Sequence, residues 1–252
     1  MRIWLAGLTM WLAMVGTGLW LGGTSGPAAA PAPKVYVGLF KDDAVAVIDP
    51  AQGRRLATIP VPKGPHGLVI TPDGRKVYVS SDGASTVSVI DTGTDRVARS
   101  IEVGANPHGL AISRDGRTML VSVYGANEAV VVDTASDRIT TRIPVARPHN
   151  AALSPDGSRA YVASQPQGAT ALVTLDLAAG REIARLPLDH TPRAVDASPD
   201  GARVFFTVGG VDAVQVLDVA AERVVAQIPV GASPHLAMFT PDGRRGVRGG
   251  EG

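Results

Sequence analysis

A repeat of about 42 residues, running five times from residue 34 to 243, constrains the fold of this chain more than any other sequence feature. In the copy at residues 65–103, short runs of Val, Ile, Leu and Tyr alternate with turn sequences. These turns are Pro-Asp-Gly at 72–74, Ser-Asp-Gly at 81–83 and Asp-Thr-Gly at 91–93. Such a pattern predicts a four-stranded antiparallel meander, because Gly supplies the positive φ that tight turns require.

The aspartate of the Pro-Asp-Gly-like turn marks the period. It recurs after 42, 41, 44 and 42 residues, at Asp73, Asp115, Asp156, Asp200 and Asp242. A four-strand unit of about 40–45 residues is typical of a β-propeller, where each unit forms one blade around a central channel. The sequence therefore predicts an all-β propeller of four-stranded antiparallel blades, with about five blades present.

Two stretches of the second copy resemble the YVTN-type repeat of bacterial β-propellers: Val77-Tyr78-Val79-Ser80 and TVSVID at 86–91. The resemblance extends over about residues 34–243. Proteins of this shape include secreted bacterial propellers, propeller lactonases and the haem d1 domain of nitrite reductases. The resemblance implies an architecture and leaves the activity open among these classes.

The ends of the repeat region allow two forms of ring. Residues 35–61 hold a second, third and fourth strand, whereas 234–243 hold a first strand and its turn. Joining them would complete a five-blade ring and remove an exposed strand edge. The alternative is a truncated ring of seven blades, the number usual in the resembling family. Residues 244–252, RRGVRGGEG, lack a strand pattern and predict a disordered tail.

Residues 1–33 predict a signal peptide followed by a Pro/Ala-rich linker. Arg2 precedes an apolar run, and small residues with several prolines follow it. We therefore expect a periplasmic or secreted protein. The run is close to the ~20 residues that span a bilayer, so an uncleaved anchor is the alternative, and only then would the chain contact a membrane.

Composition excludes several classes of function. The formal net charge is +1, with 24 basic and 23 acidic residues, so we expect no nucleic acid partner. The absence of cysteine excludes disulfides, thiolate nucleophiles and the Cys-based attachment of c-type haem. No Gly-x-Ser-x-Gly stretch of a serine hydrolase is present. We assign no catalytic residue.

Four of the five histidines occupy one repeat offset, at the start of the first strand of each unit. The residues at this offset are His66, His108, His149, Arg193 and His235. First strands line the channel of a propeller, so we expect these side chains around one mouth. Imidazole is a common ligand of zinc and copper, which makes the four histidines candidates for a divalent transition metal. Several histidines and one arginine would also suit an anion or a macrocycle. The alternative is that duplication copied a histidine that merely packs.

Two further residues are candidates for ligand binding. Asp196 lies in the first strand of its unit, where the other units carry an apolar residue. A carboxylate there must be paired or hydrogen-bonded, either to the neighbouring strand or to a metal or water in the channel. Tyr124, in the loop after a second strand, is a candidate for stacking on a ligand.

These observations favour a non-catalytic scaffold that binds a small ligand or an extracytoplasmic protein partner at the channel face. One alternative is a metal-dependent lactonase-like hydrolase that uses Asp196 and the histidines. The other is a protein that binds or handles haem d1 or a metal ion, and this alternative rests on the resemblance.

Overall fold

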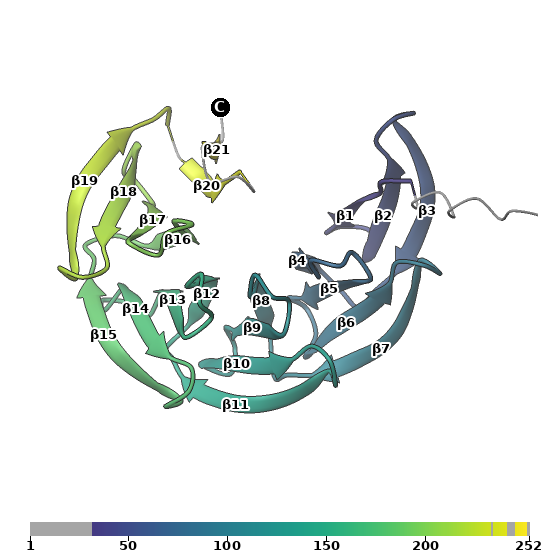
Figure 1. The fold of residues 1–252 in the computed structure, drawn as a ribbon, viewed down its shortest axis with the longest axis horizontal. Coiled ribbons are helices and arrows are strands. Elements are labelled where there is room, and N and C mark those ends of the chain that lie inside the picture. The colour runs from purple at the N-terminus through teal and green to yellow at the C-terminus, as the bar shows by residue number, and fades with distance from the viewer. Residues whose placement is uncertain (1–31, 233, 241–244, 251–252) are drawn as a thin grey trace, which may run out of the picture. The chain divides into compact units, whose positions relative to one another are not determined.

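The computed structural model describes residues 32–232, 234–240 and 245–250, and the described secondary structure consists of strands (Figure 1). The predicted signal peptide and linker cover residues 1–33, of which residues 1–31 lie outside the described part. In the described ranges no helix is long and apolar enough to cross a membrane. The propeller occupies the compact unit of residues 33–252.

Five consecutive repeats form five sheets, which we number blades 1–5, and a smaller sheet follows them (Figure 1). Blade 1 has three strands, β1 (Val35–Leu39), β2 (Ala44–Asp49) and β3 (Arg54–Pro60). Blade 2 comprises β4 (Pro65–Ile70), β5 (Lys76–Ser81), β6 (Thr86–Asp91) and β7 (Arg96–Glu102). Blade 3 comprises β8 (Pro107–Ile112), β9 (Thr118–Val123), β10 (Glu128–Asp133) and β11 (Arg138–Pro144).

The remaining sheets continue the series. Blade 4 comprises β12 (Pro148–Leu153), β13 (Arg159–Ser164), β14 (Ala171–Asp176) and β15 (Arg181–Pro187). Blade 5 comprises β16 (Pro192–Ala197), β17 (Arg203–Val208), β18 (Ala213–Asp218) and β19 (Arg223–Pro229). The last sheet pairs β20 (Pro234–Phe239) with β21 (Gly246–Gly250). Together they form a partial β-propeller of about five blades, as the repeat predicted.

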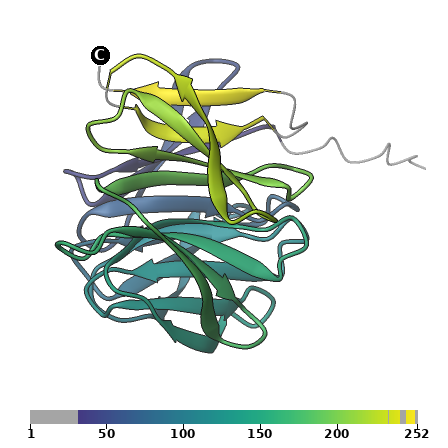
Figure 2. The same cartoon turned by 90° about the vertical axis from the view of Figure 1, so that its left-hand side faces the viewer.

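Packing between blades explains the hydrophobic pattern of each repeat. The two middle strands of a blade are buried on both faces, so that even Ser80, Ser81 and Ser88 of β5 and β6 have no exposed surface. Tyr78, Val87 and Val89 of blade 2 pack in one cluster with Met119 and Val121 of blade 3. The outermost strands are largely exposed and run obliquely across the inner ones, as the twist of each sheet requires (Figure 2).

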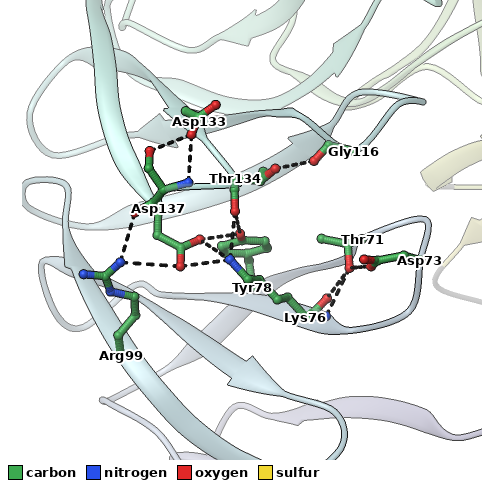
Figure 3. Close-up of polar contacts among 10 residues, drawn as sticks. Thr71, Asp73, Lys76, Tyr78, Arg99, Gly116, Asp133, Thr134 and Asp137 are labelled. Atoms are coloured by element: carbon green, nitrogen blue, oxygen red, sulfur yellow. Dashed lines mark hydrogen bonds and ion pairs between the residues drawn. The ribbon is translucent and has the colours of Figure 1, made fainter.

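A buried polar contact joins blade 2 to blade 3 (Figure 3). The hydroxyl of Tyr78 donates to Oδ1 of Asp137 at 2.6 Å, and Nζ of Lys76 lies 3.0 Å from the same carboxylate. Asp137 occupies a left-handed turn position with φ of 54°. Tyr36, Lys34 and Asp95 repeat this contact between blades 1 and 2. The contact is therefore a repeated feature of the blade junction, and the sequence patterns did not predict it.

The C-terminal strands correct two expectations. β20 pairs with β21, and in the described residues β1 pairs with β2 alone, so the predicted strand exchange that would close a five-blade ring is not formed. Residues 244–252 were expected to be disordered, yet Gly246–Gly250 form a strand. The physical reason is that a ladder needs only backbone N–H and C=O groups, so a Gly/Arg segment can extend an available sheet edge.

Candidate ligand-binding mouth of the channel

The residues of the predicted ring each stand second in the innermost strand of their sheet. They are His66 on β4, His108 on β8, His149 on β12, Arg193 on β16 and His235 on β20. Successive innermost strands lie side by side around the axis (Figure 1). Equivalent residues therefore gather at one end of these strands, which we call the histidine mouth.

Three imidazoles of the histidine mouth lie against one another. The ring centroids of His66 and His108 are 3.6 Å apart with a tilt of 42°, and those of His108 and His149 are 4.0 Å apart with a tilt of 38°. On the next two innermost strands, Nη1 of Arg193 on β16 lies 3.0 Å from Nδ1 of His235 on β20. The structure thus brings the predicted residues together as a stacked triplet and an Arg–His pair.

Glycine next to the histidines makes this close approach possible. A Cβ on Gly67 would lie 2.5 Å from the carbonyl oxygen of His108, and one on Gly109 would lie 2.5 Å from that of His149. The hydroxyl of Ser80 also hydrogen-bonds the His108 carbonyl. Innermost strands of neighbouring blades can therefore pack with almost no side chain between them, which brings the imidazoles into contact.

The stacked histidines are neutral near pH 7. Burial, followed by the charge of His66, lowers the pKa of His108 from 6.5 to about 4. Burial, followed by the charge of His108, lowers the pKa of His149 to about 3. Removal from water by its neighbours lowers the pKa of His66 as well. In the described part of the chain, Nδ1 of His108 and Nδ1 of His149 are buried without a hydrogen-bond partner.

The geometry of the described residues gives no support to the predicted metal site, which stays a prediction. Among residues 32–232, 234–240 and 245–250, no group of three or more His, Asp or Glu side chains is placed to hold a metal ion. The rings of His66 and His108 are tilted by 42° and those of His108 and His149 by 38°, and His235 lies against the positive charge of Arg193. Stacked rings do not direct their nitrogens to one centre, and a guanidinium repels a cation.

Tyr124 lies at the same mouth, as expected. Its ring centroid is 6.2 Å from that of His108, and the guanidinium of Arg147 lies 5.3 Å from the Tyr124 centroid. Nη1 of Arg147 also donates to the Tyr124 hydroxyl at 3.3 Å. One ring face of Tyr124 is therefore occupied by an arginine, which adds positive charge to the mouth.

Asp196 lies near the other end of β16, away from the histidine mouth. Its Oδ2 accepts the N–H of Phe239 on the neighbouring β20 at 2.7 Å, and its Oδ1 accepts that of Ala197 at 2.9 Å. Burial raises the pKa of Asp196 despite these hydrogen bonds. The residue lines a cavity of about 500 Å³ whose described walls include Arg114 and Asn150 and no histidine. Asp196 is thus the carboxylate hydrogen-bonded to the next strand, one of the two predicted alternatives.

Comparison with curated proteins gave no match. Among solved structures, the chain resembles Kuenenia stuttgartiensis hydrazine synthase with a TM-score of 0.64 and 18% identity, over 91% of this chain and 95% of that one. It resembles the β-propeller domain of Myceliophteria thermophila Cps50 (Swd1) with a TM-score of 0.64 and 16% identity, over 74% of this chain and 64% of that one. These two likenesses concern the fold.

A third solved structure is more similar in sequence. The dihydro-heme d1 dehydrogenase NirN, in complex with DHE, aligns with a TM-score of 0.66 and 25% identity, over 82% of this chain. The alignment spans 46% of the NirN chain. The family model of YNCE-like beta-propellers matches residues 3–110 and 30–156. This protein belongs to the YNCE-like β-propeller family.

Proposed function

We propose that this protein is an exported, non-catalytic scaffold that binds a ligand or a protein partner at the histidine mouth. The observation that carries the proposal is the pair of buried Nδ1 atoms, on His108 and His149, that lack hydrogen-bond partners in the described part of the chain. Buried polar atoms are nearly always satisfied, and leaving one unpaired costs about 1–3 kcal/mol. Two such atoms in adjacent rings favour a role in binding over a role in stability.

The separation of Asp196 from the histidines supports binding rather than hydrolysis. A lactonase-like site would need a carboxylate and imidazoles that converge on one substrate. Here the Asp196 oxygens are engaged by the amides of Ala197 and Phe239, at the opposite end of the innermost strand from Arg193. The histidine mouth itself offers neutral imidazoles and cationic guanidinium groups, which suit recognition.

Mass spectrometry of complexes tests the proposal. The full-length chain is isolated from the extracytoplasmic fraction of its source, as wild type, as the His108→Ala/His149→Ala double variant and as Asp196→Asn. We expect a bound ligand or partner on the wild type and on Asp196→Asn, and its loss from the double variant. Equal retention by the double variant would place binding elsewhere. Lactone turnover by the wild type that disappears in Asp196→Asn would instead support the hydrolase.

A tetrapyrrole is the second candidate ligand, because NirN, which shares 25% identity with this chain, was solved in complex with DHE. The donor set fits in part: His66, at the end of the stack, is the most exposed of its three imidazoles, and Arg193 could pair with a carboxylate of the macrocycle. Titration with ferric haem provides the test. A change in the haem absorption spectrum that is lost in His66→Ala supports this candidate, and an unchanged spectrum rejects it.

A further inference from the structure

A polar cavity of about 700 Å³ opens beside the histidine mouth, between blades 4 and 5. Its walls come from the loop after β13, the loop before β16 and the loop after β17. The side chains of Gln165, Thr170, Thr191 and Arg193 contribute amide, hydroxyl and guanidinium groups. Gly209 and Gly210, in the loop after β17, contribute only backbone atoms to the cavity wall.

Blade 5 departs from the repeat at two neighbouring positions of this cavity. In each full blade we compare the second residue of the innermost strand with the first residue after the next strand. The pairs are His66 with Asp82, His108 with Tyr124, His149 with Gln165 and Arg193 with Gly209. Blade 5 thus has the arginine and, facing it, a residue with no side chain.

The absent side chain leaves one edge of the Arg193 guanidinium open. Nη1 lies 3.0 Å from Nδ1 of His235, so this nitrogen is engaged. A Cβ on Gly209 would lie 3.4 Å from Nε and 3.7 Å from Nη2. A side chain at 209 would therefore cover the Nε–Nη2 edge, whereas glycine exposes it to the cavity.

The charge of Arg193 has no carboxylate partner in the part of the chain that the structure describes. The ion pairs of those residues do not include Arg193, although Asp189 lines the same cavity. Arg193 is partly buried, and its neighbour His149 is neutral near pH 7. A partly buried cation without a counter-charge is unfavourable, so the cavity attracts an anion.

We infer that this cavity binds a small organic carboxylate whose two oxygens accept hydrogen bonds from Nε and Nη2 of Arg193. Two parallel donors on one planar edge match a carboxylate, and the amides and hydroxyls of the walls suit a hydroxylated ligand body. One arginine, in a cavity that Asp189 also lines, provides little compensation for the double charge of phosphate. The inference deepens the proposed function and rests on it, since it names a ligand class for the same mouth.

Isothermal titration of the full-length chain at constant ionic strength tests the inference. The probes are acetate, succinate, citrate and D-galacturonate, with D-galactose as the neutral counterpart of galacturonate and inorganic phosphate as the competing anion. We expect at least one carboxylate to bind, and galacturonate to bind about tenfold or more tightly than galactose. Arg193→Gln should weaken carboxylate binding about tenfold or more because it removes the charged donors, and Gly209→Ala should do the same because its Cβ covers them.

Arg114→Gln is the matched control, because it removes the same charge from an arginine that lines the Asp196 cavity. It should leave carboxylate binding unchanged. Binding of none of the four carboxylates, stronger binding of phosphate than of every carboxylate, or equal loss in Arg114→Gln would overturn the inference. If carboxylates fail while the complex that depends on His108 and His149 persists, the inference falls and the proposed function stands. If no complex depends on His108 and His149 but carboxylate binding depends on Arg193, the inference stands and the proposed binding at the histidines is rejected.

Discussion

His108 shows how the fold sets the chemistry of a single side chain. Only 9% of its surface is exposed, and His66 and His149 lie on either side of its ring. Protonation would place a charge in a site that is poorly hydrated and next to other titratable rings, with Arg193 beyond His149. The negative charge of Asp82 opposes this effect without cancelling it. The three stacked histidines, His66, His108 and His149, are therefore neutral donors and acceptors near pH 7.

Stability should fall in mild acid because of this residue. An unfolded His108 takes up a proton near pH 6.5, whereas the folded one does so only near its pKa of about 4. Between these values the unfolded state binds more protons, so the free energy of unfolding decreases as pH falls, by on the order of 3 kcal/mol at ~1.36 kcal/mol per pKa unit. Urea unfolding at pH 7.5 and pH 5 measures the part of this loss that occurs above pH 5, about 2 kcal/mol at ~1.36 kcal/mol per pKa unit. His108→Gln should show a smaller loss, and an identical loss in both proteins would contradict the account.

At the same scale, sequence reasoning located the row of residues but not their arrangement. The repeat offset was enough to predict that His66, His108, His149, Arg193 and His235 share one mouth. It gave no sign that the rings stack, because stacking depends on how closely Gly67 and Gly109 let the strands approach. The repeat shows Arg193 as a departure from histidine, but it does not show that Gly209 lies against the guanidinium.

Between whole strands, the junction of blades 2 and 3 combines burial with one specific polar contact. Tyr78 is fully buried, and the side chain of Asp137 is 7% exposed. Their hydrogen bond lies at the edge of the cluster in which Tyr78 packs against blade 3. The corresponding junction of blades 3 and 4 has Thr118, Leu120 and Gly180 at these positions and so cannot form the contact. The sequence patterns missed it because its partners are 59 residues apart.

Asp137→Asn should lower the free energy of unfolding by about 1–3 kcal/mol, the range for a hydrogen-bonded charged group. Asn keeps the left-handed turn at position 137 accessible, so the change isolates the loss of charge. Urea unfolding of the wild type, Asp137→Asn, Tyr78→Phe and the double variant completes a double-mutant cycle. We expect a coupling energy of about 0.5 kcal/mol or more. Additive effects of the two changes would show that the contact contributes nothing to the junction.

Across the whole molecule, the position of a blade in the series determines how deeply the equivalent residues of its repeat are buried. Ile143 on β11 is fully buried against the residues of blade 4, and Ile59 and Ile101 are 4% and 7% exposed. The equivalent Ile228 on β19 is 45% exposed. Identical positions of the repeat thus differ in burial because the neighbouring blade supplies the cover.

Matched substitutions measure this difference. Ile143→Ala should cost about 2–5 kcal/mol of unfolding free energy, as for other buried aliphatic side chains. Ile228→Ala should change it by about 0.5 kcal/mol or less, because the side chain already contacts solvent. Denaturant midpoints of both variants provide the comparison. Equal costs would mean that Ile228 is covered in solution.

The number and order of blades were accessible from the sequence, since the Asp-Gly turns count the repeats. Closure was not. Pairing of 234–243 with the first blade satisfied every local pattern, yet β20 pairs with β21 instead. Strand exchange depends on the distance between two edges, and a repeat pattern carries no information about that distance. The strand at Gly246–Gly250 escaped prediction because glycine has no side chain to reveal the face that it presents.

The central claim is that the histidine mouth is the binding surface of this propeller, and site-specific photo-crosslinking tests it most directly. A benzophenone amino acid replaces Tyr124 at the mouth or, as the control, Ile183, which is 38% exposed on the outermost strand β15. The full-length chain is irradiated in its source extract and the crosslinked mass is measured. We predict a discrete adduct from position 124 that disappears in the His108→Ala/His149→Ala background, and none from position 183. Equal adducts from both positions, or an adduct at 124 that survives loss of the histidines, would contradict the claim.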